Sequence, residues 1–282
     1  MEAFGGGDVG GLKAPGTSNT TLRKDMQVRE FEHRGWKVTS KNAPILSSGE
    51  IEKLESELGF PVPEMIFGNN ELVLEHSSGL RIAFNCCDAL RKVDSTGTSG
   101  LLKVAYADDW ARTRQDTDTE IAKPYDWTYT PEYRGTWTIP SSMQFEEDGE
   151  DAIPVDKLMK PDPILFFDEL DLFEDELGDN GTAVLNVKIR IMQERLLVLC
   201  RFHLRVDDVL FRIKDVRIFV EFNDNGKTVL IKDYILREAP YKDVVRRIDP
   251  IIEDLGAKLR DVNWVSSCMK IVAHEVEKLV IG

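Results

Sequence analysis

The sequence predicts an α+β fold, namely a single domain with a large, mainly antiparallel β-sheet and flanking helices. Apolar and polar residues alternate with period two over much of the chain between Ile164 and Arg237, as in strands with one buried face. Short turn signals separate the alternating runs, which favours hairpins. Apolar residues recur at helical spacing before and after this region, so helices are expected beside the sheet.

The N-terminal part of the chain predicts a tail followed by short elements. Residues 1–27 are rich in glycine and small polar residues, which is typical of a disordered tail, so the domain is expected to span residues 28–282. Ser47 and Glu50 offer N-cap chemistry for a helix that ends near Leu58. The other elements expected here are a strand at 36–39, a hairpin of strands 72–75 and 80–84, and a short helix over 85–93 with Asn85 as N-cap.

The middle of the chain is less regular. Residues 101–106 fit a strand or a helix, whereas 108–114 predict a helix. Aromatic and polar residues alternate from Tyr125 to Tyr129, which favours a strand. An acidic loop is expected at about 141–152. Prolines then predict an extended chain, at positions Pro154, Pro161 and Pro163.

Two long alternating runs predict the centre of the sheet, at 185–191 and 196–206. Asp207 and Asp208 form the expected two-residue turn after the second run, and Asp208 would need a positive φ there. This turn would pair Val206 with Val209 and Phe202 with Ile213.

The alternation changes phase after this hairpin. The next apolar series begins at Val216, an odd step from Ile213, so both series can face one core only across an extra residue. We therefore expect a β-bulge at about Lys214–Asp215.

The C-terminal region predicts one more strand and then helices. Asn225-Gly226 is a strong hairpin turn that leads into a strand from Lys227 to Arg237. Apolar residues between 244 and 259 fit a helical stripe interrupted by Pro250. Ser266 and Ser267 can cap a last helix that runs through Leu279.

Composition narrows the classes of function. The net charge of −14 repels a phosphate backbone, so no nucleic-acid partner is expected. We recognise no signal peptide and no apolar run of the ~18–20 residues that a membrane span needs, so no membrane association is expected. The four cysteines include no CxxC pair, and Cys86 and Cys87 are adjacent. This usage indicates a reducing compartment, hence a cytoplasmic location, with the nucleus as a second one.

No catalytic constellation is recognised, so a non-enzymatic role without cofactor or metal is expected. The four histidines lack metal-ligand spacing, and the chain has no nucleophile elbow or phosphate-binding loop. Glu169 and Asp171 share one strand face, which keeps a carboxylate-based hydrolase or cation site open beside the simpler interpretation of a solvated acidic face. His203 is out of phase with the apolar residues of its strand, so it should face solvent or the second face of the sheet.

Several short strings, in the same order, resemble one family. They are Val62–Gly68, Phe84–Leu90, Leu102–Ala105, Lys123–Tyr129, Tyr133–Thr136, Phe173–Leu177, Asp179–Gly181, Val187–Met192 and Leu204–Asp207. The set resembles the Tip-forty-one-like (TIPRL) family of regulators of TOR signalling, from about Gly35 to Leu279. The resemblance implies a non-enzymatic protein, monomeric on its own, that binds the catalytic subunits of type 2A, 4 and 6 serine/threonine phosphatases and modulates their activity or assembly. An alpha-four-type phosphatase-associated protein is a further implied partner.

The resemblance also implies four partner-binding residues. They are Asp88 in the Asn-x-x-Asp-Ala-Leu string, Ile153 after the acidic loop, and Ile213 and Asp215 after the hairpin. The predicted bulge would turn Ile213 and Asp215 outward together, as an apolar anchor beside a charge. Asp215→Leu is then expected to weaken phosphatase binding with little loss of stability. For Asp88 the alternative is a carboxylate stabilised by the helix dipole, and for the protein it is an adaptor of the same fold for another partner.

Overall fold

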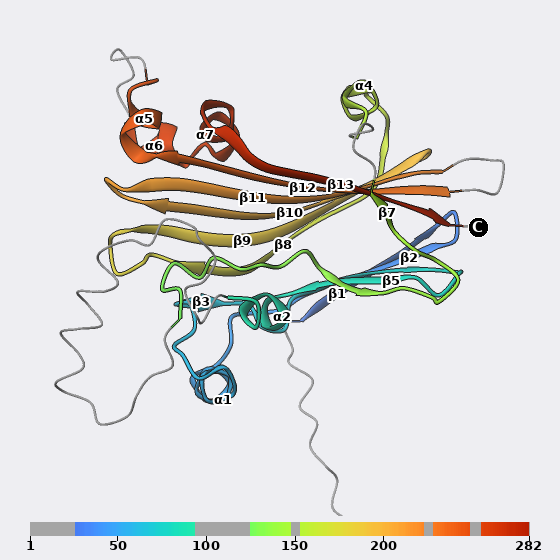
Figure 1. Cartoon of the computed structure of the whole chain (residues 1–282). Coiled ribbons are helices and arrows are strands. Elements are labelled where there is room, and N and C mark those ends of the chain that lie inside the picture. The colour runs from blue at the N-terminus through green and yellow to red at the C-terminus, as the bar shows by residue number, and fades with distance from the viewer. Residues whose placement is uncertain (1–25, 94–124, 148–152, 223–227, 249–254, 282) are drawn as a thin grey trace, which may run out of the picture.

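Two antiparallel sheets face each other in the computed structural model of the protein, which describes residues 26–93, 125–147, 153–222, 228–248 and 255–281 (Figure 1). The larger sheet has eight strands in the order β3-β8-β9-β10-β11-β12-β13-β7, and the smaller has five in the order β1-β2-β4-β5-β6. Six helices are described beside them. This architecture confirms the predicted α+β fold with a large, mainly antiparallel sheet and flanking helices.

The bounds of the elements are as follows. The large sheet contains β3 (Met65–Ile66), β7 (Glu146–Glu147), β8 (Ile164–Asp175), β9 (Gly181–Met192), β10 (Arg195–Val206), β11 (Leu210–Glu221), β12 (Thr228–Pro240) and β13 (Lys270–Ile281). The small sheet contains β1 (Gln27–His33), β2 (Trp36–Asn42), β4 (Glu71–His76), β5 (Arg81–Asn85) and β6 (Thr136–Thr138). The helices are α1 (Ser48–Leu58), α2 (Cys86–Leu90), α4 (Val155–Met159), α5 (Tyr241–Val245), α6 (Leu255–Arg260) and α7 (Val262–Cys268).

The predicted N-terminal elements are confirmed. The strand at 36–39 is β2, the hairpin is β4–β5, and the helices are α1 and α2. The Glu50 carboxylate accepts hydrogen bonds from the backbone N–H and the hydroxyl of Ser47, at 2.9 and 2.5 Å. Residues 1–25 of the predicted tail and the segments expected at 101–106 and 108–114 lie outside the described residues. Gln27, placed in the tail by the sequence, begins β1.

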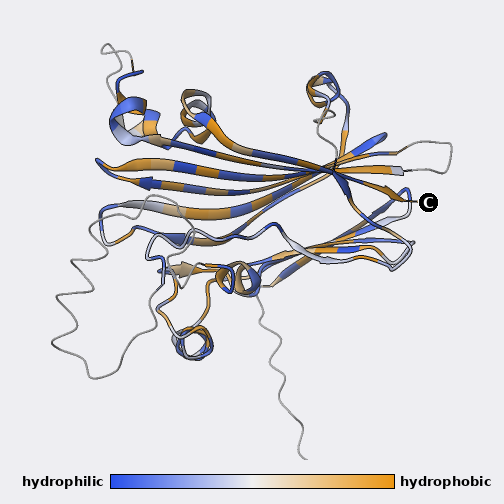
Figure 2. Ribbon diagram, in the orientation of Figure 1, coloured by the Kyte–Doolittle hydropathy of each residue, from blue (hydrophilic) through white to orange (hydrophobic). Residues whose placement is uncertain are grey.

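The main core lies between the facing sides of the two sheets. Alternate residues of each long strand point into it, so hydrophobic and hydrophilic residues alternate along the ribbons (Figure 2). Its fully buried side chains come from both sheets, for example Trp36, Leu74 and Phe84 from the small sheet and Phe202 and Ile218 from the large one. We call the side of the large sheet that faces this core the inner face, and the opposite side the outer face.

Helices cover the outer face at its two ends (Figure 1). At one end, residues of α5, α6 and α7 pack on Phe211 and Ile213 of β11 in a second apolar cluster. At the other end, Ile153 and the half-buried Leu158 of α4 pack on Phe219 of β11 in a third cluster. The large sheet is therefore buried on both faces at its ends.

The predicted register of the β10–β11 hairpin was wrong by one residue. Val206 pairs with Leu210 and His203 with Ile213, because the turn contains three residues, Asp207–Val209. Asp208 has a φ of 60°, so its expected positive φ is confirmed. A shift of one residue moves every later side chain of β11 to the opposite face.

The predicted bulge at Lys214–Asp215 was also wrong. Strand β11 pairs with β10 and β12 without a break from Leu210 to Glu221. The change of phase arises because the side chain of Ile213 packs in the cluster on the outer face, whereas that of Val216 packs in the inner core. Two buried faces explain the sequence pattern without an extra residue.

Other predictions failed where local sequence was ambiguous. Residues 125–129 form a turn rather than a strand, with Tyr129 at a φ of 53° and its N–H donating to the Asp126 carbonyl at 2.9 Å. Helix α4 occupies the stretch after Pro154 that was expected to be extended, and Glu146–Glu147 of the acidic loop form β7.

The C-terminal prediction was right for a strand and for short helices, but wrong for the last element. The strand expected at 227–237 is β12, and α5 and α6 overlap the two ends of the predicted helical stripe. The predicted helix from Ser266 to Leu279 is replaced by α7 and then β13. Strand β13 has an extra residue, Val272, because Arg237 pairs with Ile271 and Leu236 with Ala273. This bulge hides the period of two.

Candidate binding surface

Three of the four predicted partner-binding residues share the outer face of the large sheet. Ile213 is 0% exposed beneath α5–α7, and Ile153 is 4% exposed against Phe219 at the other end. Asp215 lies between these two clusters and is 3% exposed. Asp88 lies on α2, which follows β5 of the small sheet.

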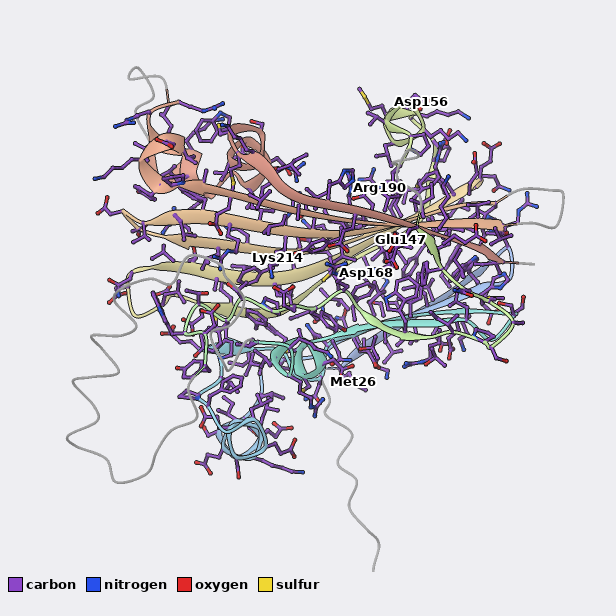
Figure 3. All side chains as sticks on the ribbon, in the orientation of Figure 1. Met26, Glu147, Asp156, Asp168, Arg190 and Lys214 are labelled. Carbon is purple, nitrogen blue, oxygen red and sulfur yellow. The ribbon has the colours of Figure 1, made fainter. Side chains whose placement is uncertain are left out.

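Between the two outer clusters, the strand register aligns two rows of residues across the sheet. One row contains Lys188, Leu199, Arg217, Asp233 and Val276, and the other contains Asn186, Arg201, Asp215, Ile235 and His274. We call these two rows, together with Arg237 beside them, the charged strip. Figure 3 shows Arg190, at the margin of this strip, toward the side of α4, and Lys214 toward the small sheet.

Asp215 is held by guanidinium groups on both neighbouring strands. Arg201 of β10 lies directly opposite and donates through Nε to Oδ1 at 2.6 Å and through Nη2 to Oδ2 at 2.8 Å. Arg237 of β12 places Nη1 3.6 Å from Oδ2. Nη1 of Arg201 donates to the Asn263 side chain on α7 at 3.0 Å. A bidentate pair of this kind fixes the orientation of both partners.

A second buried carboxylate lies one row away. Asp233 is 0% exposed, and its Oδ2 accepts from Nη2 of Arg217 at 2.6 Å and lies 3.4 Å from Nε2 of His274. Within the described part of the chain, Oδ1 of Asp233 and Nε of Arg217 are buried without a hydrogen-bond partner. The strip therefore contains buried polar groups that its own contacts leave partly unsatisfied.

The carboxylates of the strip lie deeper than its cations. The side chains of Asp215 and Asp233 are 4% and 0% exposed, whereas those of Arg201, Arg237 and Arg217 are 16%, 18% and 30% exposed. Solvent therefore meets guanidinium groups rather than carboxylates. This arrangement can bind an oxyanion.

Asp88 is part of a separate hydrogen-bonded cluster. Asn85 caps α2 by accepting from the Asp88 N–H at 2.8 Å, as predicted. The Asp88 Oδ2 accepts from the Thr136 hydroxyl at 2.6 Å and from the Asn85 amide at 2.9 Å, and Oδ1 accepts from Arg91 at 3.1 Å. Partial burial raises the pKa of Asp88, but these hydrogen bonds and the charge of Arg91 outweigh it, so the pKa lies below its ordinary value.

The turn beside Thr136 connects this cluster to the edge of the large sheet. Arg134 donates to both carboxylate oxygens of Glu275 on β13, at 2.5 and 2.8 Å, and stacks over the Tyr234 ring at 3.9 Å. Gly135, between Arg134 and Thr136 in the sequence, has a φ of 86°, and a Cβ there would lie 2.9 Å from the Phe84 ring. Glu275 adjoins His274 of the charged strip. Strand β13 therefore lies between the Asp88 cluster and the charged strip.

Comparison with known proteins decides the family. A family model described as the TIP41-like family matches residues 65–245, which is more than half of the chain. The chain belongs to the TIP41-like family. The matched residues include Asp88, Ile153, Ile213 and Asp215, and the resemblance noted in the sequence is confirmed.

Relatives in this family cover most of the chain. The protein is 42% identical over 263 residues to the "Type 2A phosphatase activator TIP41" of Saccharomyces cerevisiae, over 86% of this chain and 72% of that one. It is 39% identical over 255 residues to a human "TIP41-like protein", over 89% of each chain. It is 36% identical over 252 residues to the "Type 2A phosphatase activator tip41" of Schizosaccharomyces pombe, over 89% of this chain and 97% of that one.

Glu169 and Asp171 share the outer face of β8, as predicted, and burial together with the charge of Glu169 raises the pKa of Asp171. Glu169 pairs with Lys188 at 2.6 Å, and Asp168 on the inner face pairs with Arg29 of β1 at 3.2 Å. The described segments contain no group of three or more His, Cys, Asp or Glu side chains placed to hold a metal ion. No helix in the described ranges is both long and apolar enough to cross a membrane.

His203 lies on the outer face of the large sheet, which is the second of the two positions predicted for it. It is 7% exposed because α5–α7 cover that face, and its ring lies 6.4 Å from the ring of Phe211. Burial and the charges of Arg201 and Arg205 lower the pKa of His203 to about 4. A neutral, buried imidazole here contributes to packing.

Sequence reasoning missed the arginines of the charged strip. Arg201, Arg217 and Arg237 stand at polar positions of alternating strands, which normally face solvent. A usable signal was present, because Asp215 and Asp233 alternate with apolar residues that are buried on the same face. Buried carboxylates require cationic partners on adjacent strands.

Proposed function

We propose that this protein is a non-enzymatic regulator that binds the catalytic subunit of a type 2A-like serine/threonine phosphatase. The proposed contact surface runs from the charged strip around β13 to Asp88. Two relatives in yeasts are named type 2A phosphatase activators, which supports the class of partner. The observation that carries the surface is the connection through Arg134, which joins the Asp88 cluster to β13 beside the strip.

The chemistry of this surface suits binding more than catalysis. Each carboxylate in it accepts hydrogen bonds from a cation or from a hydroxyl or amide group, as Asp215 does from Arg201 and Asp88 does from Thr136. Such paired groups hold shape and charge but do not supply a free base. Fixed charges beside the partly exposed strand β13 can select a partner by electrostatic complementarity.

Ile213 and Ile153 have an indirect role in this proposal. Both side chains are buried, so a partner can touch them only if the covering helices move. We assign them to the two apolar clusters that hold α5–α7 and α4 beside the strip. Their replacement would weaken binding by displacing the walls of the surface.

Binding of purified catalytic subunits, measured by biolayer interferometry, tests the proposal. Type 2A, 4 and 6 catalytic subunits and an alpha-four-type protein serve as the panel, because the family resemblance implies all of them. We expect the wild-type chain to bind at least the type 2A subunit, and phosphatase activity in the bound state gives the direction of regulation. If the chain binds none of the catalytic subunits, the alternative of an adaptor for another partner replaces this proposal.

Two variants test the location of the surface. Asp88→Arg reverses the charge of the half-exposed carboxylate beside Thr136, and Arg237→Gln neutralises a cation of the strip while Arg201 still pairs with Asp215. We expect each to weaken binding about tenfold. Lys37→Gln, on the small sheet and 41% exposed, is the control and should bind as wild type does. Unchanged binding by both test variants would place the contact elsewhere on the protein.

A further inference from the structure

Asp215 is poorly placed to touch a partner, although it is the charged residue implied at this site. It is 3% exposed, and both of its oxygens accept hydrogen bonds from Arg201. Arg237 approaches the same carboxylate from β12. A partner that reached Asp215 would first meet these guanidinium groups. Its effect on binding must therefore pass through them.

The arginines of the strip retain hydrogen-bonding capacity. A guanidinium group has five N–H donors. Arg217 uses Nη2 on Asp233, and its Nε is buried, so only the Nη groups of this 30% exposed side chain can face a partner. Among the described residues, Arg237 makes a single ion pair, at 3.6 Å. Arg201 is more fully used, because it also donates to Asn263.

The three guanidinium groups outnumber by one the two buried carboxylates with which they pair. Burial lowers the pKa of Arg237, and although Asp215 opposes this effect, the like charges of Arg217 and Arg201 lower the pKa further. An added anion would relieve this repulsion. One excess charge matches a singly charged carboxylate better than a phosphate that carries nearly two charges.

We propose that Arg201, Arg217 and Arg237, here called the arginine triad, bind a carboxylate side chain of the partner, and that Asp215 positions the triad without contacting the partner. This inference rests on the proposed function and gives the chemistry of its contact. The charge that contacts the partner is therefore positive, opposite in sign to that of Asp215. Arg217 and Arg237 supply donors through the Nη groups of their partly exposed side chains, and Arg201 links the triad to α7 through Asn263.

Binding of the type 2A catalytic subunit by four variants separates the two roles. Arg237→Gln should weaken binding about tenfold, and Arg237→Lys should restore part of the loss because lysine keeps the charge but lacks the planar fork. Asp215→Asn keeps one of the two acceptors that Arg201 uses, so it should weaken binding less than Arg237→Gln does. Arg246→Gln is the matched control, since Arg246, the C-cap residue of α5, is 77% exposed and its loss changes the net charge equally.

The opposite result would overturn the inference. If Asp215→Asn loses binding tenfold while Arg237→Gln binds as Arg246→Gln does, Asp215 itself is the contact. Thermal melting of each variant accompanies the binding measurement. If Asp215→Asn does not fold, the comparison of the three arginine variants decides alone.

Competition identifies the anion and separates this inference from the proposed function. A short glutamate-rich peptide should displace the catalytic subunit from the wild-type chain, whereas inorganic phosphate at the same ionic strength should not. The reverse result would indicate a phosphorylated ligand and would overturn the proposal that the triad binds a carboxylate. If the wild-type chain binds no catalytic subunit, the proposed function fails. The triad is then tested by direct binding of the labelled peptide, which Arg237→Gln should weaken and Arg246→Gln should not. Equal peptide binding by both variants would refute the triad.

Discussion

Replacement of Ile213 by alanine tests whether apolar packing holds α5–α7 on the outer face. Ile213 is 0% exposed and packs with Val244 and Val265 of the covering helices. Truncation of a fully buried isoleucine costs about 2–5 kcal/mol, from lost transfer free energy and the cavity left behind. For a chain of this size each kcal/mol lowers the melting temperature by about 2–4 °C, so we expect a fall of roughly 4–20 °C. Urea denaturation followed by circular dichroism measures the free energy, and hydrogen exchange in α5–α7 locates the loss.

Ile271→Ala is the matched control for this experiment. Ile271 is on the same sheet but is 53% exposed, so its truncation should change the free energy of unfolding by less than about 0.5 kcal/mol. If Ile213→Ala costs as little as Ile271→Ala, the helices do not bury Ile213 in solution. Loss of phosphatase binding by such a stable variant would make Ile213 a direct contact and would contradict the indirect role assigned to it.

Three further predictions concern buried groups of the large sheet. His203, with a folded pKa of about 4 against an ordinary value near 6.5, stays neutral in the folded state while the unfolded state gains a proton, so stability should fall as the pH drops below about 6.5. The loss at pH 4.5 is about 2–3 kcal/mol, and His203→Gln should remove it in paired urea titrations at pH 7 and 4.5. Gly181→Ala places a Cβ 1.9 Å from the Arg205 carbonyl oxygen at a φ of 153°, so it should cost about 3 kcal/mol or more in thermal melts, whereas Gly49→Ala, whose Cβ meets nothing within 4 Å, should not. Asp215→Leu should cost about 3–5 kcal/mol, because Arg201 would lose its buried partner; a melting temperature within a few degrees of wild type would restore the original expectation for this variant.

Elements with local signals were predictable from the sequence. Helix α1 has its N-cap pair of Ser47 and Glu50, and α2 has Asn85. The long strands β9 and β10 can be recognised from the alternation of apolar and polar residues, because one face of each packs in the inner core. These features depend on residues close together in the chain.

Features that depend on distant segments were not predictable. The turn at Asp207–Val209 has three residues instead of two, and nothing near it in the sequence distinguishes the registers. The outer face of β11 is buried only because α5–α7, later in the chain, pack on it. The sequence therefore predicted the wrong environment for Ile213 and Asp215, the two residues of this strand that the family resemblance implies as partner contacts.

The extra residue in β13 has a consequence for solubility. Strand β13 lies near the edge of the large sheet, and among the described residues only Glu277 and Lys278 pair with β7. Its first half exposes Ile271 and Val272, at 53% and 59%, which in a straight edge strand would form a template for aggregation by a second molecule. The bulge at Val272 bends this edge and interrupts its row of backbone donors and acceptors. One inserted residue thus lets an apolar strand border the proposed binding surface while opposing the formation of fibres.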